Sequence, residues 1–117
     1  MHELSLATDI IEIVKSSVPP AELHEIESIR IEIGDFAGVV CDSLVFSFMA
    51  ITQGTELEGA ELDIVHRPFL IKCNNCGEES TNEFGLCICT PCGSTDTVLI
   101  SGSELKVKEV KLREIKV

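Results

Sequence analysis

Two Cys-x-x-Cys pairs are the most specific chemical signature of this chain. The first pair is Cys73 with Cys76, the second is Cys89 with Cys92, and a glycine follows each pair. A glycine at that place lets the backbone fold over a metal so that amide groups point at sulfur. Four thiolates at this spacing form a closed tetrahedral shell, which is typical of structural and not of catalytic sites. The pattern predicts structural Zn²⁺ on these four cysteines and leaves a rubredoxin-like iron site open.

The other two cysteines leave one alternative open. Cys87 lies two residues before Cys89 and could replace it as a ligand, although Cys89 gives the more symmetric arrangement. Cys41 has apolar neighbours and is interpreted as a core or boundary residue. A disulfide framework is disfavoured because the paired spacing and an expected cytosolic location favour metal. A redox role for Cys89 and Cys92 is disfavoured because Gly93 opens a turn where a helix would be required.

The first three residues form a second candidate metal site. The α-amino group of Met1, the amide nitrogen of His2 and its imidazole Nδ1 can close fused chelate rings around one ion. Nitrogen ligands in such an array suit Ni(II) or Cu(II) better than Zn(II). Glu3 is interpreted as a supporting ligand or as a residue that positions the terminus. A helix is expected directly behind this tripeptide, which would hold it against the domain.

Apolar periodicity predicts two amphipathic helices that position these groups. The first covers residues 4–18 and ends at Pro19-Pro20, because proline cannot continue a helix. The second is N-capped by Asp42 and ends before Gly54, where a left-handed C-cap is expected. Alternation of apolar and polar residues predicts two strands, at residues 29–33 and 60–65.

The last segment, residues 105–117, alternates charged and apolar residues with slips in phase. We interpret it as a strand with a bulge, with a short helix as the weaker alternative. It is the most basic part of the chain and should pair with the acidic strands before it. The expected fold is therefore α+β: two helices on one face of a small β-sheet, formed by residues 1–66 and 104–117. Residues 67–103 are expected to form an inserted zinc-ribbon-like module of short hairpins.

Charge and composition exclude several classes of function. The formal net charge is −11, and 13 of the 20 acidic residues precede position 67. Such a surface repels phosphate, and the chain has no Trp or Tyr for base stacking, so nucleic-acid binding is not expected. No apolar run reaches the roughly 18 residues of a membrane span. The N-terminal residues do not resemble a signal peptide, which predicts a cytoplasmic protein without membrane association.

No enzyme active site is predicted. The sequence has no evident Ser/His/Asp arrangement, phosphate-binding glycine loop or buried acidic pair. His24 lies among glutamates and is interpreted as a surface residue. His66, at the edge of the cysteine-rich module, could contact either metal region.

Together, these residues resemble one protein family over essentially the whole chain. The family is the HypA/HybF family of hydrogenase nickel-incorporation proteins. The similar parts are the start Met1-His2-Glu3-Leu4-Ser5-Leu6-Ala7, Gly54-Thr55 with residues 58–62, both cysteine pairs and residues 101–105. The resemblance implies a metallochaperone that carries Ni²⁺ as cargo at Met1, His2 and Glu3. It also implies structural zinc at Cys73, Cys76, Cys89 and Cys92.

The resemblance further implies two protein partners, a nickel-handling maturation GTPase and the [NiFe]-hydrogenase large subunit. One departure from the family is visible, because the second cysteine pair usually reads Cys-Pro-x-Cys and here has Thr90-Pro91 between its cysteines. Histidines that flank the pairs in some members are absent. The alternative function, from another class, is a zinc-ribbon scaffold or adaptor that carries no nickel.

Overall fold

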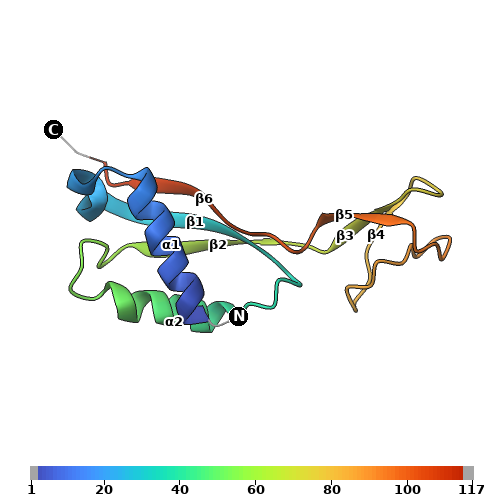
Figure 1. Ribbon diagram of the computed structural model, residues 1–117, viewed down its shortest axis with the longest axis horizontal. Helices are drawn as coiled ribbons and strands as arrows, with labels where there is room; N and C mark the ends of the chain where they lie inside the picture. The colour runs from blue at the N-terminus through green and yellow to red at the C-terminus, as the bar shows by residue number, and fades with distance from the viewer. Residues whose placement is uncertain (1–2, 115–117) are drawn as a thin grey trace. The chain divides into compact units, whose positions relative to one another are not determined.

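The computed structural model of the chain describes residues 3–114. It confirms the α+β class, with two α-helices, one 3-10 helix and two small sheets (Figure 1). In chain order the elements are α1 (Glu3–Ser17), η1 (Pro20–Glu25), β1 (Ile26–Gly34), α2 (Cys41–Thr52), β2 (Glu61–Arg67), β3 (Leu70–Cys73), β4 (Glu79–Ser80), β5 (Thr97–Ser101) and β6 (Leu105–Leu112).

The chain divides into two compact units. The first comprises residues up to Glu32, Gly38–Val65 and the segment from Lys106 onward, and the second comprises Ile33–Ala37 and His66–Leu105. The cysteine-rich segment lies wholly in the second unit. None of the helices within residues 3–114 combines the length and apolar character needed to cross a lipid bilayer.

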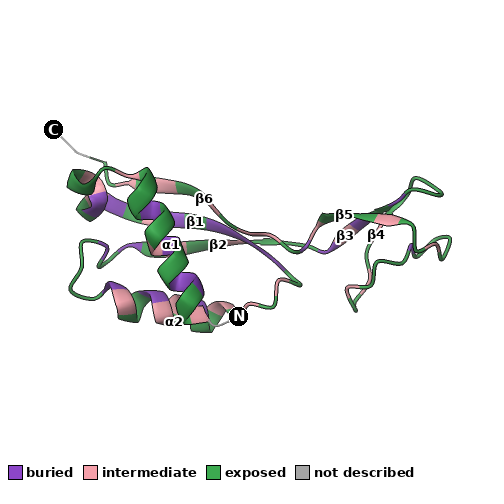
Figure 2. Ribbon diagram, viewed as in Figure 1, coloured by how far each residue is buried: buried purple, intermediate pink, exposed green. Residues whose placement is uncertain are grey.

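The first unit is a three-stranded sheet, in the order β2-β1-β6, covered by helices. Helix α1 lies across the sheet and packs against α2, which runs alongside β2 (Figure 1). Most of the central strand β1 is buried (Figure 2), because it has a strand on each side and helices on one face, whereas Glu27 and Arg30 are exposed. The core side chains named here come from α1, β1 and α2: Leu6, Ala7, Ile10, Val14, Ile26, Ile29, Ile31, Leu44 and Phe48.

Ion pairs link the strands of this sheet. Arg30 of β1 pairs with Asp63 of β2 at 2.9 Å and with Glu109 of β6 at 2.9 Å. The predicted pairing of the basic last segment with an acidic strand is confirmed, since Lys108 Nζ lies 3.4 Å from Glu32 Oε1. The Glu32 side chain is only 5% exposed. A buried carboxylate needs such a partner because leaving it uncompensated is costly.

Three local predictions need correction. Asp42 is not the N-cap of α2: the helix begins one residue earlier, its N-cap is Val40, and Asp42 lies in the first turn, where the helix dipole favours an acidic side chain. In α1 the buried face runs through Leu6 and Ile10, so Leu4, the first residue of the predicted amphipathic helix and apolar, does not join that face and is 53% exposed. The polar segment around His24, for which the sequence predicts neither helix nor strand, forms the 3-10 helix η1, which a proline begins.

Two other predictions about helix and strand ends are confirmed. Gly54 has φ +77°, the left-handed conformation expected just after α2. The last segment is a strand through Leu112, and its exposure alternates with one slip in phase at Lys108-Glu109, which excludes the helical alternative there. Residues 115–117 lie outside the described residues.

The second unit is built on an antiparallel sheet in the order β4-β3-β5. Strand β3 pairs with β5 so that Cys73 lies opposite Thr97, and with β4 so that Ile71 lies opposite Ser80. Phe36 and Phe69 form an edge-to-face ring pair with centroids 5.2 Å apart. This short sheet places the first cysteine pair at the end of β3.

Candidate metal centre

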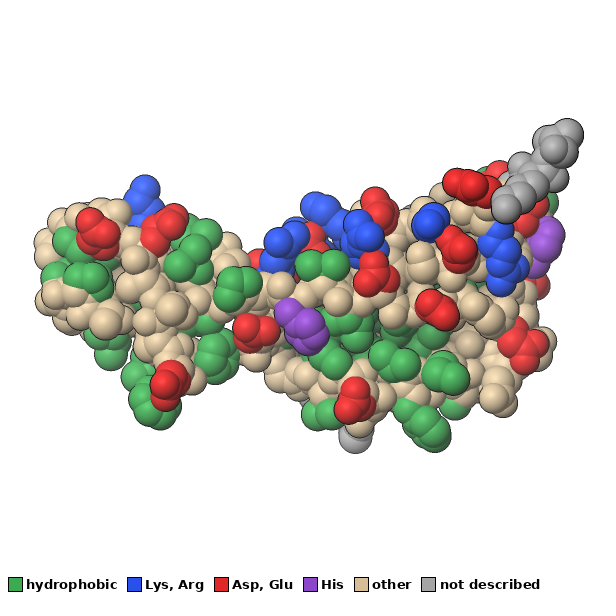
Figure 3. Space-filling view, turned by 180° about the vertical axis from the view of Figure 1, so that it is seen from behind, with side chains coloured by type: hydrophobic (Ala, Val, Ile, Leu, Met, Phe, Trp, Pro, Cys, Tyr) green, Lys and Arg blue, Asp and Glu red, His purple; other side chains and the backbone are tan. Residues whose placement is uncertain are grey.

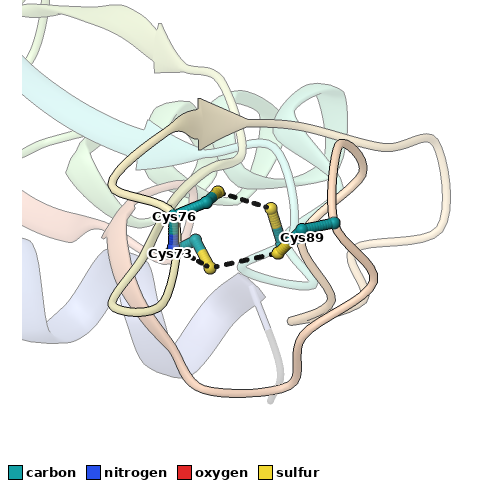
Figure 4. Close-up of side chains that lie close together, drawn as sticks. Cys73, Cys76 and Cys89 are labelled. Atoms are coloured by element: carbon teal, nitrogen blue, oxygen red, sulfur yellow. Dashed lines mark hydrogen bonds between the residues drawn. The ribbon is translucent and has the colours of Figure 1, made fainter.

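Four cysteines of the second unit meet in one cluster. The Sγ atoms of Cys73, Cys76, Cys89 and Cys92 all lie within 4.8 Å of one another. Two of these distances cross between the pairs: Cys73 Sγ to Cys92 Sγ is 3.6 Å, and Cys76 Sγ to Cys89 Sγ is 3.5 Å. Figure 4 shows Cys73 and Cys76 on one loop, with their sulfurs directed toward the loop that carries Cys89. The four cysteines singled out in the sequence are therefore brought together.

The two loops have the same backbone pattern. In the first, Gly77 N–H donates to Cys73 O at 2.9 Å and Cys73 N–H donates to Glu78 O at 2.9 Å. In the second, Gly93 N–H donates to Cys89 O at 2.7 Å and Cys89 N–H donates to Ser94 O at 2.9 Å. Gly77 and Gly93 have φ of +78° and +76°, which a residue with a Cβ rarely adopts. The local pattern Cys-x-x-Cys-Gly thus builds each half of the cluster independently.

Backbone amides stabilise one of the sulfurs as a thiolate. The N–H groups of Cys76 and Asn75 point at Cys73 Sγ, at 3.4 and 3.3 Å. The Cys76 amide contributes most to lowering the pKa of Cys73, to about 6, and outweighs the opposing effect of burial. At Cys89 burial dominates and raises the pKa of the thiol to about 12. A cation bound here has to displace that proton, which couples metal affinity to pH.

The cluster fits a tetrahedral metal ion. With Zn–S bonds of about 2.3 Å, the sulfurs of a regular tetrahedron lie about 3.8 Å apart. The cross-pair distances of 3.5 and 3.6 Å are close to this value and far longer than the roughly 2.05 Å of a disulfide. Cys73 and Cys89 are buried, and four sulfur donors leave no open coordination position. The donor set suits a structural ion.

A side-chain link between the two halves was not foreseen from the sequence. Asn74 donates through its backbone N–H to Asp96 O at 2.9 Å and through its side-chain amide to Asp96 Oδ1 at 3.1 Å. Asn74 lies inside the first cysteine loop and Asp96 lies just after the second. The contact fixes the spacing of the loops, and no motif or periodicity indicates it because the residues are 22 positions apart.

Within residues 3–114, the other cysteines and histidines lie outside this cluster. Among residues 3–114, the group of four cysteines close enough to bind one metal ion contains Cys89 and not Cys87, whose side chain is exposed. Cys41 is partly buried, as a boundary residue is expected to be. His24 is exposed, and His66 Nδ1 faces Asp35 Oδ1 at 3.8 Å on the surface of the second unit.

The tripeptide at the start of the chain is described only in part. Met1 and His2 lie outside the described residues, so the nickel site expected there stays a prediction. Glu3 is the first residue of α1, and its Oε2 accepts a hydrogen bond at 3.3 Å from the backbone N–H of Val40. Val40 is the N-cap of α2, and no side chain of α2 caps that end. The Glu3 carboxylate thus lies at the N-terminal end of a helix, where a negative charge is favoured.

Fold and site define a class: a small α+β protein with a separate, cysteine-rich metal-binding unit. The family model for "Hydrogenase/urease nickel incorporation, metallochaperone, hypA" matches residues 1–112. The chain belongs to the HypA family of hydrogenase maturation factors. That membership confirms the resemblance found in the sequence.

Curated relatives match over nearly their full length. The hydrogenase maturation factor HypA of Trichormus variabilis is 40% identical, covering 98% of each chain. That of Trichodesmium erythraeum is 38% identical over the whole of both chains. Among solved structures, the Ni metallochaperone HypA of Helicobacter pylori matches with a TM-score of 0.67 at 22% identity, covering 97% of this chain and 98% of that one. This last likeness establishes the shared fold.

Proposed function

We propose that this protein is a nickel metallochaperone that binds Ni(II) at its N-terminus and delivers it during maturation of [NiFe]-hydrogenase. The observation that carries the proposal is the family match over residues 1–112, which includes the tripeptide Met1-His2-Glu3. The α-amino group and His2 supply nitrogen ligands suited to Ni(II). Because these ligands compete with protons, nickel is held reversibly, as a carrier requires.

Glu3 acts in this proposal mainly as a positioning residue. Its carboxylate accepts the hydrogen bond from Val40 N–H at the start of α2. This contact anchors the residue that follows His2 to the start of α2. Ligation of nickel by the same oxygen would require this hydrogen bond to break. Glu3→Gln, which keeps a carbonyl acceptor, is expected to weaken nickel binding much less than loss of the His2 imidazole.

The second unit, in this proposal, is held together by structural zinc on Cys73, Cys76, Cys89 and Cys92. When bound, the ion joins the two cysteine loops and supplies folding energy to a unit with a small core. The amides of Asn75 and Cys76 already direct hydrogen bonds at one sulfur. No part of nickel carriage is assigned to this cluster.

The proposed partners are those of hydrogenase maturation: a nickel-handling GTPase that cooperates in delivery and the hydrogenase large subunit that receives the metal. Relatives bear the name hydrogenase maturation factor, which supports a role within that machinery.

Nickel titration of the protein with a free amino terminus tests this function. One equivalent of Ni(II) should bind tightly, detected by calorimetry and by d–d absorption. Adding one residue before Met1 removes the amine from the chelate and should weaken binding by at least tenfold, while zinc content is unchanged. Equal binding by both forms would contradict a nickel site at the amino terminus, and absence of binding in both would favour the adaptor function without nickel carriage.

A further inference from the structure

A pocket of about 490 Å³ lies between α2 and the beginning of β2 in the first unit. Its apolar wall consists of Val45, Phe48 and Met49 from α2, with Leu62 from β2 opposite them. Met49 is 59% exposed although it is apolar. Figure 3 shows hydrophobic side chains gathered beside the band of charged side chains on this unit. The pocket therefore offers an apolar contact surface next to a polar one.

One wall of this pocket is an edge strand. In the order β2-β1-β6, residues 3–114 give β2 a strand partner on the β1 side only. Alternate residues of such a strand direct their backbone N–H and C=O groups away from the sheet, where another extended chain can pair with them. An incoming strand on this edge would run beside α2. Every second side chain on it would then face the pocket.

The charged side chains around the pocket indicate that the incoming segment is basic. Glu58 and Glu61 line the pocket, and neither forms an ion pair with any of residues 3–114. At the opposite edge of the same sheet, β6 supplies lysines to acidic side chains of β1: Lys108 to Glu32 and Lys111 to Glu27. The sheet thus already pairs an acidic strand with a strand that alternates Lys and apolar residues. At the open edge, no neighbouring strand of residues 3–114 supplies a lysine to Glu58 or Glu61; Arg113 Nη2 lies near Gly59, and this guanidinium donates through Nη1 to His24 O.

We propose that the β2 edge and its pocket bind an extended, basic segment of a partner protein by strand addition, with one apolar side chain of that segment against Met49 and Leu62. Lysines or arginines on either side of the apolar residue pair with Glu58 and Glu61. The binding surface belongs to the first unit and requires neither metal, so its test is independent of nickel carriage.

The test uses the zinc-loaded full chain and a short, fluorescein-labelled peptide that alternates Lys with Val and has one central Leu. Binding is measured by anisotropy, and the site by amide chemical shifts in NMR. Shifts should concentrate in residues 45–53 and 58–65. N-methylation of alternate peptide nitrogens should abolish binding in one of the two frames only, because only every second N–H faces the strand.

Matched variants distinguish binding in this pocket from nonspecific electrostatic attraction to an acidic protein. Met49→Gln and Glu61→Gln should each weaken binding by about tenfold, equivalent to about 1.4 kcal/mol. Phe46→Gln, on the same helix but outside the pocket, and Glu56→Gln, an exposed carboxylate outside it, should change the affinity less than twofold. Far-UV circular dichroism checks that each variant remains folded.

Three outcomes would overturn the proposal. Equal loss in the pocket variants and their controls would mean that only net charge attracts the peptide. Equal binding of both N-methylated frames would exclude strand pairing. A concentration-dependent dimer that dissociates with Met49→Gln would mean that a second copy of this chain covers the groove.

Discussion

At the scale of single residues, two cysteines whose pKa values are shifted in opposite directions explain how the cluster is prepared for a cation. Amide donors keep Cys73 close to the thiolate form near neutral pH, with a pKa of about 6, whereas burial keeps Cys89 protonated, with a pKa of about 12. The two sulfurs thus differ in protonation state near neutral pH. Metal binding has to remove more than one proton from the cluster, and how many it removes depends on pH.

This inequality predicts the pH dependence of zinc affinity. Protons compete with the metal at the thiolates, so affinity falls as pH falls. Above about pH 6 Cys73 is largely a thiolate and adds little to the slope of log affinity against pH. Below about pH 6 Cys73 also binds a proton, so this slope becomes steeper by up to one decade of affinity per pH unit. Competition with a chromophoric chelator from pH 8 to 5 measures this. A constant slope across pH 6 would contradict the assigned pKa of Cys73.

The choice between Cys87 and Cys89 gives a second prediction. Cys89 belongs to the group of four sulfurs and Cys87 does not. Cys89→Ala should reduce zinc to well below one equivalent and cost the second unit most of the metal's contribution to its stability, which for such sites is on the order of 10 kcal/mol. Cys87→Ala is the matched control and should retain one equivalent, measured by atomic emission on the dialysed protein. Zinc loss in Cys87→Ala would move the ligand to that position.

At the scale of secondary structure, the sequence indicated most elements and missed what depends on contacts between them. The proline pair, Gly54 and the alternation in β1 each specify a local conformation, so those elements were predictable. The start of α2 was not, because its N-cap is Val40, and a carboxylate from α1, Glu3, lies there in the place of a local capping side chain.

In the cysteine cluster, too, local structure was predictable from the sequence and contacts between distant residues were not. Each Cys-x-x-Cys-Gly loop was predictable, since its hydrogen bonds are local, but the link from Asn74 to Asp96 was not. Likewise, the exposed position of Leu4 depends on which side of α1 meets α2, and periodicity alone defined the apolar stripe too broadly.

The pairing of β6 with β1 predicts a specific loss of stability. Lys108→Met removes the cation beside Glu32, whose side chain is nearly buried, and should lower the free energy of unfolding by about 1–3 kcal/mol. Lys106→Met, an exposed position on the same strand, should change it by less than about 0.5 kcal/mol. Urea unfolding of the zinc-loaded protein, followed by circular dichroism, compares the two. Equal midpoints would mean that this ion pair contributes little.

At the scale of the whole molecule, the protein has an acidic α+β unit and a small unit organised by four cysteines. The formal net charge of −11 opposes contact with phosphate backbones. Gel-shift assays with duplex and single-stranded DNA at low salt should therefore detect no binding in the micromolar range. Tight binding that weakens as salt is added would contradict this prediction and favour a nucleic-acid role for the cysteine-rich unit.

The central claim is that nickel is carried by the first residues of the chain. The most direct measurement is calorimetric titration of Ni(II) into His2→Ala and into the matched variant His24→Ala, both zinc-loaded and both with a free amino terminus. His24 is exposed on η1, so its replacement should leave one equivalent of nickel bound. His2→Ala should abolish binding without changing zinc content or circular dichroism. Stoichiometric nickel binding by His2→Ala at neutral pH would contradict the account.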